Sequence, residues 1–139
     1  MSIRFPLKIR VLATLAALAI AVAALAAPPS TPPVPALSPP DLDAALKAGV
    51  PLVVEFGGER CIPCMNMQPV LKDLQALLSK RARVVNFWIQ PNPEVARRHQ
   101  IIVMPTQVIF DAKGREIFRH MGYFAQPDFE KALKEKGLL

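Results

Sequence analysis

Hydrophobic residues recur along the chain at two spacings, and these spacings predict alternating helices and strands. Between Cys61 and Lys80 the apolar positions recur every three or four residues, the period of one helix face. These positions are Met67, Val70, Leu71, Leu74, Leu77 and Leu78. Leu52–Phe56 is instead a short apolar run with β-branched residues, which is typical of a buried strand. The Gly57-Gly58 pair that follows predicts a break between the two elements.

The same alternation continues to the end of the chain. We predict helices over residues 41–48, 61–80, 93–99 and 126–136, and strands over 52–56, 83–89, 107–110 and 116–120. Residues 111–114 (Asp-Ala-Lys-Gly) join the last two strands as a hairpin. Strands separated by helices form parallel pairs, whereas a hairpin is antiparallel. The predicted fold is therefore α/β, with a central mixed sheet of about four strands flanked by helices on both faces.

The first 26 residues have the pattern of an export signal. Arg4, Lys8 and Arg10 form a positive segment, and the uncharged apolar run 11–27 follows it. Ala24-Leu25-Ala26 is suited to cleavage before Ala27. The alternative is an uncleaved membrane anchor, because seventeen apolar residues are near the lower limit for a spanning helix. Either interpretation places the domain outside the cytoplasm, which means the periplasm if the cell is a Gram-negative bacterium.

A proline-rich segment separates this signal from the expected domain. Residues 28–40 contain seven prolines, and proline fixes φ and removes the backbone donor. We therefore predict an extended linker over 27–40 and a folded domain over 41–139.

Composition narrows the class of function. The formal net charge is +6, but three of the seventeen basic residues lie within the first ten positions. Without these three, 14 basic residues face 11 acidic ones, a net charge of +3. This mild positive charge, without basic runs interleaved with aromatics, does not indicate nucleic-acid binding. The chain gives no reason to expect an oligomer, so we predict a monomer.

The chain has two cysteines, Cys61 and Cys64. They close too short a loop to stabilise a fold, and they indicate reactivity instead.

Cys61-Ile62-Pro63-Cys64 lies between a predicted strand and the start of a predicted helix. Unsatisfied N–H groups and the helix dipole stabilise a thiolate there. We expect Cys61 to attack a substrate disulfide and the more buried Cys64 to resolve the mixed disulfide. Arg60 adds positive charge beside the pair.

The two cysteines have three alternative uses. A zinc site needs two further ligands, and only His99 and His120 remain, unpaired and far apart in sequence. Covalent haem attachment needs a histidine at position 65, which is Met65. Copper(I) binding stays open as a minor alternative, because Met65 and Met67 lie nearby. We expect no metal and no cofactor other than the cysteine pair. We expect His99 on a solvated helix face and assign no role to His120.

The stretch from Leu52 to Leu138 resembles the thioredoxin family. The resemblance is carried by five motifs beyond the cysteine pair, which occur in the family's order: Val53-Val54-Glu55-Phe56, Pro69, Asn92-Pro93, Met104-Pro105-Thr106 and Gly122. Several positions depart from the family's usual residues: Gly57, Arg60, Ile62 and Asn86. No convincing first strand precedes Asp41.

The resemblance also implies roles for individual residues. Pro105 is expected in a cis peptide bond beside the redox pair, and Met104 is expected to offer backbone groups to an extended substrate. Glu55 matches a buried acid beneath the second cysteine, where it would exchange a proton with Cys64; a solvent-facing Glu is the alternative. We place five residues in the substrate-binding surface: Arg60, Ile62, Pro63, Met104 and Pro105.

The sequence therefore predicts an exported thiol–disulfide oxidoreductase. The leading hypothesis is a reductant of protein disulfides, recharged by a membrane thiol donor. The alternatives are an oxidant or exchanger with the same site, and a copper-binding or client-docking module without turnover.

Overall fold

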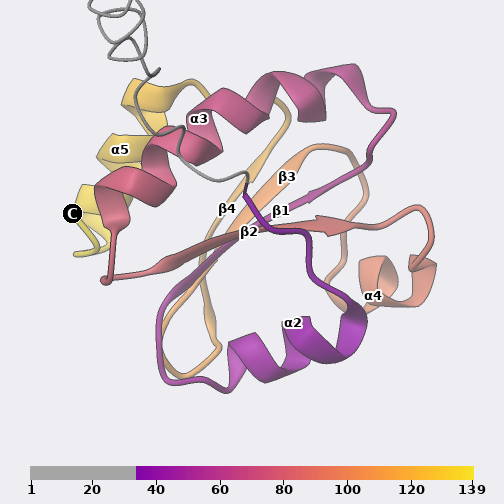
Figure 1. Cartoon of the computed structure of the whole chain (residues 1–139), viewed down its shortest axis with the longest axis horizontal. Coiled ribbons are helices and arrows are strands. Elements are labelled where there is room, and N and C mark those ends of the chain that lie inside the picture. The colour runs from indigo at the N-terminus through magenta and orange to yellow at the C-terminus, as the bar shows by residue number, and fades with distance from the viewer. Residues whose placement is uncertain (1–33) are drawn as a thin grey trace, which may run out of the picture. The chain divides into compact units, whose positions relative to one another are not determined.

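The computed structural model describes residues 34–139, and these form an alternating series of helices and strands (Figure 1). The elements are α2 (Pro39–Leu46), β1 (Leu52–Gly57), α3 (Ile62–Leu78), β2 (Arg83–Trp88), α4 (Pro93–Arg98), β3 (Thr106–Phe110), β4 (Glu116–Met121) and α5 (Gln126–Glu135). Their order is the predicted one. Among the described residues, no helix is both long enough and apolar enough to cross a membrane.

The four strands form one mixed sheet in the order β2-β1-β3-β4. The pair β1–β2 is parallel, while β1–β3 and β3–β4 are antiparallel. Helices α3 and α5 cover one face of the sheet, and α2 and α4 cover the other (Figure 1). The predicted α/β fold with a mixed four-stranded sheet is confirmed.

Two apolar cores lie on the two faces because strand residues alternate in direction. In β1, Val53 packs with Leu71 and Leu74 of α3, whereas Val54 packs with Leu42 of α2 and Val95 of α4. All of these side chains are buried. The odd-numbered positions of β1 therefore face α3, and Glu55 is one of them.

The expected boundary at Asp41 was wrong, because the folded domain includes residues 34–40. Asn86 of β2 donates its N–H to Pro35 O at 2.8 Å and accepts from Leu37 N at 2.9 Å. Val34 is buried in the α3/α5 core, and α2 begins at Pro39. Prolines keep this segment extended, and its apolar residues and free carbonyls pair it with β2. The predicted segment 1–26 and the rest of the linker, 27–33, lie outside the described residues.

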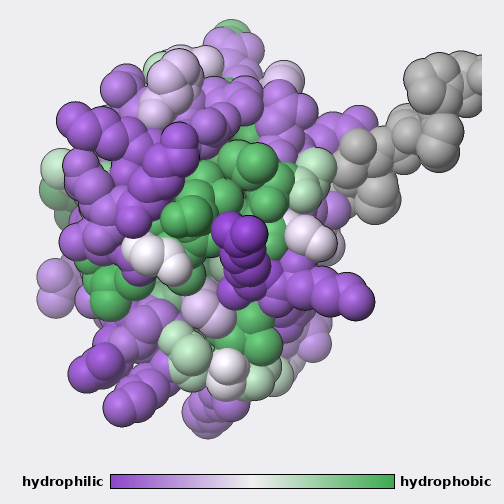
Figure 2. Space-filling model, turned by 90° about the vertical axis from the view of Figure 1, so that its left-hand side faces the viewer, coloured by the Kyte–Doolittle hydropathy of each residue, from purple (hydrophilic) through white to green (hydrophobic). Residues whose placement is uncertain are grey.

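Figure 2 shows the face at the left of Figure 1, which carries α5 and the C-terminus. Apolar side chains gather in the middle of this face, surrounded by hydrophilic ones (Figure 2). Leu138 and Leu139, half-buried, pack against the α3/α5 core. The N-terminal end of α3, where the cysteines lie, is at the opposite side of the domain (Figure 1).

Candidate active site

Cys61 and Cys64 form a disulfide at the junction of β1 and α3. Cys61 is the N-cap of α3, and its Sγ accepts the N–H of Cys64 at 3.3 Å. Cys61 is half-buried, whereas Cys64 is fully buried in the first turn of the helix. An incoming sulfur can therefore reach Cys61 but not Cys64, which is the order that disulfide exchange requires.

The electrostatic setting of the pair favours a thiolate at Cys61. The first turn of α3 contains no acidic residue, and its free N–H groups point toward the N-cap. Pro63 lies in that turn, where its missing N–H has no helical partner to lose. Pro69 lies inside the same helix. Arg60 is exposed directly before the pair.

The loop before β3 lies beside the segment that leads into the disulfide. The Met104–Pro105 peptide bond is cis, and Pro105 O accepts the N–H of Gly122 at 2.7 Å. Met104 Sδ lies 3.4 Å from the position that a Cβ on Gly58 would take, just before the cysteines. Met104 is half-buried and Pro105 is buried. The fold therefore brings the two residues of this loop close to the segment that carries the redox pair.

Exposed apolar side chains occur on the three segments around this junction. They are Ile62 and Met65 on α3, Ile102 and Val103 in the loop before Pro105, and Met121 and Tyr123 at the end of β4. Met121 is paired with Thr106, so the end of β4 lies next to the Pro105 loop. Ile62 and Ile102 are the most exposed, at 76% and 85%. This surface is suited to contact with an apolar, extended segment of another protein.

Glu55 is fully buried and points toward the disulfide from below. Its Oε1 lies 3.3 Å from the position that a Cβ on Gly57 would take, and Cys64 Sγ lies 3.2 Å from the same point. Burial raises the pKa of Glu55 from 4.5 to about 8, and the side chain of Gln107 opposes part of that rise. The carboxyl is therefore mostly protonated at pH 7 and can give a proton to Cys64 or take one from it.

Three amide side chains surround Glu55. The family resemblance placed Asn86 near the buried acid, where the family usually has a lysine, but the sequence predicted neither Gln68 nor Gln107 there. Asn86 and Gln68 exchange two hydrogen bonds, Nδ2 to Oε1 at 2.9 Å and Nε2 to Oδ1 at 3.1 Å. Gln68 Nε2 also reaches Glu55 Oε1 at 3.5 Å. Gln107 lies opposite Glu55 in the β1–β3 register. A polar residue at the start of a predicted buried strand was the available signal for Gln107.

His99 does not lie on a solvated helix face, so that expectation was wrong. Its ring is 5.3 Å from Phe56 and 5.8 Å from Phe110, between centroids, and its Nε2 is buried without a hydrogen-bond partner among residues 34–139. Burial is the main cause that lowers its pKa. The chain turns at Gln100, with φ at 54°, and this turn directs the histidine inward.

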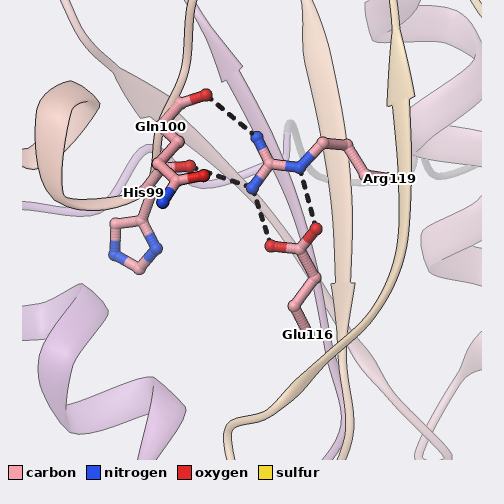
Figure 3. A network of polar contacts seen from close by, with 4 residues as sticks. All are labelled: His99, Gln100, Glu116 and Arg119. Carbon is pink, nitrogen blue, oxygen red and sulfur yellow. Dashed lines mark hydrogen bonds and ion pairs between the residues drawn. The ribbon is translucent and has the colours of Figure 1, made fainter.

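Arg119 of β4 holds that turn in place (Figure 3). Its guanidinium donates to His99 O at 2.9 Å and to Gln100 O at 3.2 Å, and it pairs with Glu116 at 2.7 Å. The turn leads directly into the loop that contains Met104 and Pro105. The network therefore fixes the start of that loop.

The two methionines near the cysteines lie in different environments. Met65 is exposed, whereas Met67 is fully buried and its Sδ accepts the N–H of Phe124 at 3.3 Å. Within residues 34–139, no three His, Cys, Asp or Glu side chains are grouped closely enough to hold a metal ion. Met67 is part of the core and is not available as a ligand.

Comparison with known proteins agrees with this geometry. The family model described as a thioredoxin-like domain matches residues 39–137. The thioredoxin of Rickettsia bellii is 29% identical over 68 residues, which cover 49% of this chain and 65% of that protein. A thioredoxin of Staphylococcus aureus is 27% identical over 93 residues, covering 67% of this chain and 88% of the relative. A bifunctional thioredoxin reductase/thioredoxin of Mycobacterium leprae is 30% identical over 77 residues, covering 55% of this chain but only 17% of its own length.

Solved structures give the same result. Mitochondrial thioredoxin 3 from Saccharomyces cerevisiae in its oxidized form has a TM-score of 0.65 and 26% identity, covering 73% of this chain and 94% of that one. A chain from a structural study of thiol resolution in yeast mitochondrial 1-Cys peroxiredoxin has the same TM-score and coverage, with 25% identity. The chain belongs to the thioredoxin-like domain family. It is a thioredoxin-like redox protein with a Cys61–Cys64 disulfide.

Proposed function

We propose that this protein is an exported thiol–disulfide oxidoreductase that reduces disulfides in other proteins. The observation that carries the proposal is the unequal burial of the two sulfurs at the start of α3. The half-buried Cys61 is accessible to a partner, and the buried Cys64 is placed to attack Cys61. The first 26 residues, with the pattern of an export signal, support a periplasmic location.

The reaction transfers two electrons and two protons from the reduced pair to the substrate. The Cys61 thiolate attacks one sulfur of the substrate disulfide, and the other sulfur leaves and takes a proton. Cys64 then loses its proton to the ionised form of Glu55 and attacks Cys61 Sγ. The second substrate sulfur leaves and takes the second proton, which returns Glu55 to its ionised form when that carboxyl supplies it, and Cys61 and Cys64 remain as the disulfide seen in the structure. A membrane thiol donor would reduce this disulfide again.

The substrate-binding surface we propose consists of Arg60, Ile62, Pro63, Met104 and Pro105. Ile62 and Pro63 are exposed beside Cys61, and Met104 lies close to the segment before it. An extended peptide that contacts Ile62 and the backbone at Met104 would pass across Cys61. The buried ring of Pro105 shapes the loop and does not itself offer a large contact area.

Trapping of mixed disulfides tests the reaction. A Cys64→Ser variant expressed in its native cells should accumulate disulfide-linked complexes with client proteins, because the resolving thiol is missing. A Cys61→Ser variant is the matched control and should form none. If both variants, or neither, form complexes, the assignment of Cys61 as the attacking sulfur is wrong.

The reduction potential of the Cys61–Cys64 pair decides the direction of electron flow. A value near about −270 mV supports a reductant, and a value near about −120 mV would instead make the protein an oxidant. Equilibration with glutathione or dithiothreitol, followed by quantification of the two redox forms, gives this value. Cell fractionation of the full chain and of a variant without residues 1–26 tests export: the full chain should lie outside the cytoplasm and the shortened one inside.

A further inference from the structure

Two neighbouring rows of side chains run across the same face of the sheet, and one row is polar whereas the other is apolar. On the α3/α5 face, Asn86, Glu55, Gln107 and His120 lie in register on β2, β1, β3 and β4. The adjacent row on the same face consists of Val84, Val53, Ile109 and Phe118. The polar row passes beneath the disulfide, and the apolar row lies further from it.

Gln107 is the member of this row that packing does not explain. Its side chain is fully buried, and neither Oε1 nor Nε2 makes a hydrogen bond of ordinary geometry among residues 34–139, although the amide lies close enough to Glu55 to lower the pKa of that carboxyl through a weaker polar contact. Burying an amide in this way costs free energy that a leucine at the same position would avoid. Directly opposite, Glu55 Oε2 is buried and also lacks a partner. The two side chains thus hold unused hydrogen-bonding groups on neighbouring strands.

We propose that Gln107 is a positioning residue, whose amide turns over to match both protonation states of Glu55 and keeps that carboxyl directed at Cys64. An ionised carboxyl needs a donor, which Gln107 Nε2 supplies. A protonated carboxyl needs an acceptor for its O–H, which Gln107 Oε1 supplies after rotation of the amide. This inference deepens the proposed function, on which it rests, by assigning a second residue to the proton transfer at Cys64.

Gln68, on the other side of Glu55, cannot do the same. Its Oε1 accepts from Asn86 Nδ2, so that atom is already occupied. Its Nε2 donates to Asn86 Oδ1, Cys64 O and, at 3.5 Å, Glu55 Oε1. Gln68 is therefore fixed in one orientation and offers only a donor. Gln107 is the amide beside Glu55 that can rotate without breaking a hydrogen bond.

The surroundings of Glu55 contain few other groups that could control its charge. The cysteine pair and Gln68 face it from α3, Asn86 faces it from β2, and Gln107 faces it from β3. His120 of β4 is the titratable group one strand further; its Nε2 lies 3.1 Å from Tyr123 O, and its ring stacks on Phe124. Burial raises the pKa of Glu55, and Gln107 is the neighbour that lowers it.

The experiment compares Gln107→Leu with Gln75→Leu, which makes the same chemical change elsewhere. Gln75 also has a buried Oε1 without a partner among the described residues, but it lies about two turns beyond Gln68 on α3. The carboxyl of Glu55 is titrated by ¹³C NMR in the oxidised full chain, where the cysteines do not titrate, with Glu55→Gln to assign the signal. In Gln107→Leu, the pKa of Glu55 should rise by roughly one further unit; in Gln75→Leu it should not move.

A second readout follows the reaction. The pH profile for reduction of a model protein disulfide should shift to higher pH in Gln107→Leu by the same amount, and Gln107→Leu should have no added effect on a Glu55→Gln background. Gln107→Met, which has a side chain of similar length, repeats the test if the leucine variant does not fold. Equal titration of Glu55 in the Gln107 and Gln75 variants overturns the inference. Because the NMR titration needs no turnover, it stands even if the protein reduces no disulfide, which would defeat the proposed function alone.

Discussion

Two titratable groups, the fully buried Glu55 and the half-buried His99, lie on opposite faces of the same sheet. Glu55 faces α3 beneath the disulfide, and the ring of His99 packs against Phe56, the residue that follows Glu55, and against Phe110. Burial acts on both and favours the neutral form of each, so it raises the pKa of Glu55 and lowers that of His99. The same physical cause thus produces opposite shifts.

The two groups differ most in the residues that surround them. Glu55 lies close to Cys64 Sγ and is surrounded by Gln68, Asn86 and Gln107. His99 lies between aromatic rings, and its backbone carbonyl is bound by Arg119. A shifted pKa indicates a functional site only when a reactive group is within reach. We therefore assign chemistry to Glu55 and packing to His99, and the predictions below test that division.

The largest expected difference is in the rate of disulfide reduction. Glu55→Gln should slow the reaction at pH 7 by about 100-fold, because it removes the group that exchanges a proton with Cys64. His99→Leu should change the rate less than about twofold, as is usual for a residue that touches no reacting atom. Steady-state reduction of a model protein disulfide measures both. Comparable losses of rate in the two variants would contradict the assignment of chemistry to Glu55 and of packing to His99.

The pH dependence of stability should separate the two groups by sign. The pKa of Glu55 is 4.5 unfolded and about 8 folded, so its contribution to stability is complete below pH 4.5 and is lost as pH rises toward 8. The pKa of His99 is lowered from 6.5, so its contribution is present above pH 6.5 and is lost at lower pH.

Between pH 6.5 and 8, only Glu55 should change the free energy of unfolding. We expect the oxidised protein to lose about 2 kcal/mol across this interval. Urea unfolding at a series of pH values should show this loss in His99→Leu and not in Glu55→Gln. A loss that persists in Glu55→Gln would show that another group titrates in this range.

The sequence predicted the elements well because the hydrophobic periods of 52–56 and 61–80 are strong, and because Gly57-Gly58 separates them. It placed Cys61, Cys64 and Pro105 through motifs that keep a fixed spacing. It did not predict Gln68 or Gln107, because their relation to Glu55 depends on the β1–β3 register and on the packing of α3. It also missed the inward position of His99, since that position depends on the positive φ at Gln100 and on contacts of Arg119 with the turn.

Close packing around Glu55 should also appear as coupling between mutations. A Cβ on Gly57 would lie 3.2 Å from Cys64 Cβ and Sγ, and 3.3 Å from Glu55 Oε1, which is closer than ordinary contact. Gly57→Ala should therefore destabilise the protein by about 1–2 kcal/mol. Part of that loss should disappear on a Glu55→Ala background, where one of the crowded atoms is gone. On a His99→Leu background the loss should be unchanged, since that residue lies on the other face.

The smallest expected effect concerns the turn that holds His99. Arg119→Met removes the donors to His99 O and Gln100 O, and it should cost about 1 kcal/mol because the carbonyls remain partly open to water. Arg119→Lys should be destabilised to a similar extent, because one ammonium cannot reproduce a guanidinium that contacts two carbonyls and Glu116.

A matched control for that variant is Asp43→Asn, which breaks the Arg98–Asp43 ion pair on the same side of the domain. Both partners are about half exposed, so this change should cost less than about 0.5 kcal/mol. Urea unfolding measures both variants, and ¹³C titration of Glu55 in Arg119→Met tests whether the faces are independent. The titration of Glu55 should not move, because Arg119 contacts neither that carboxyl nor its amides. A shift would mean that the His99 turn and the buried acid are coupled through the sheet.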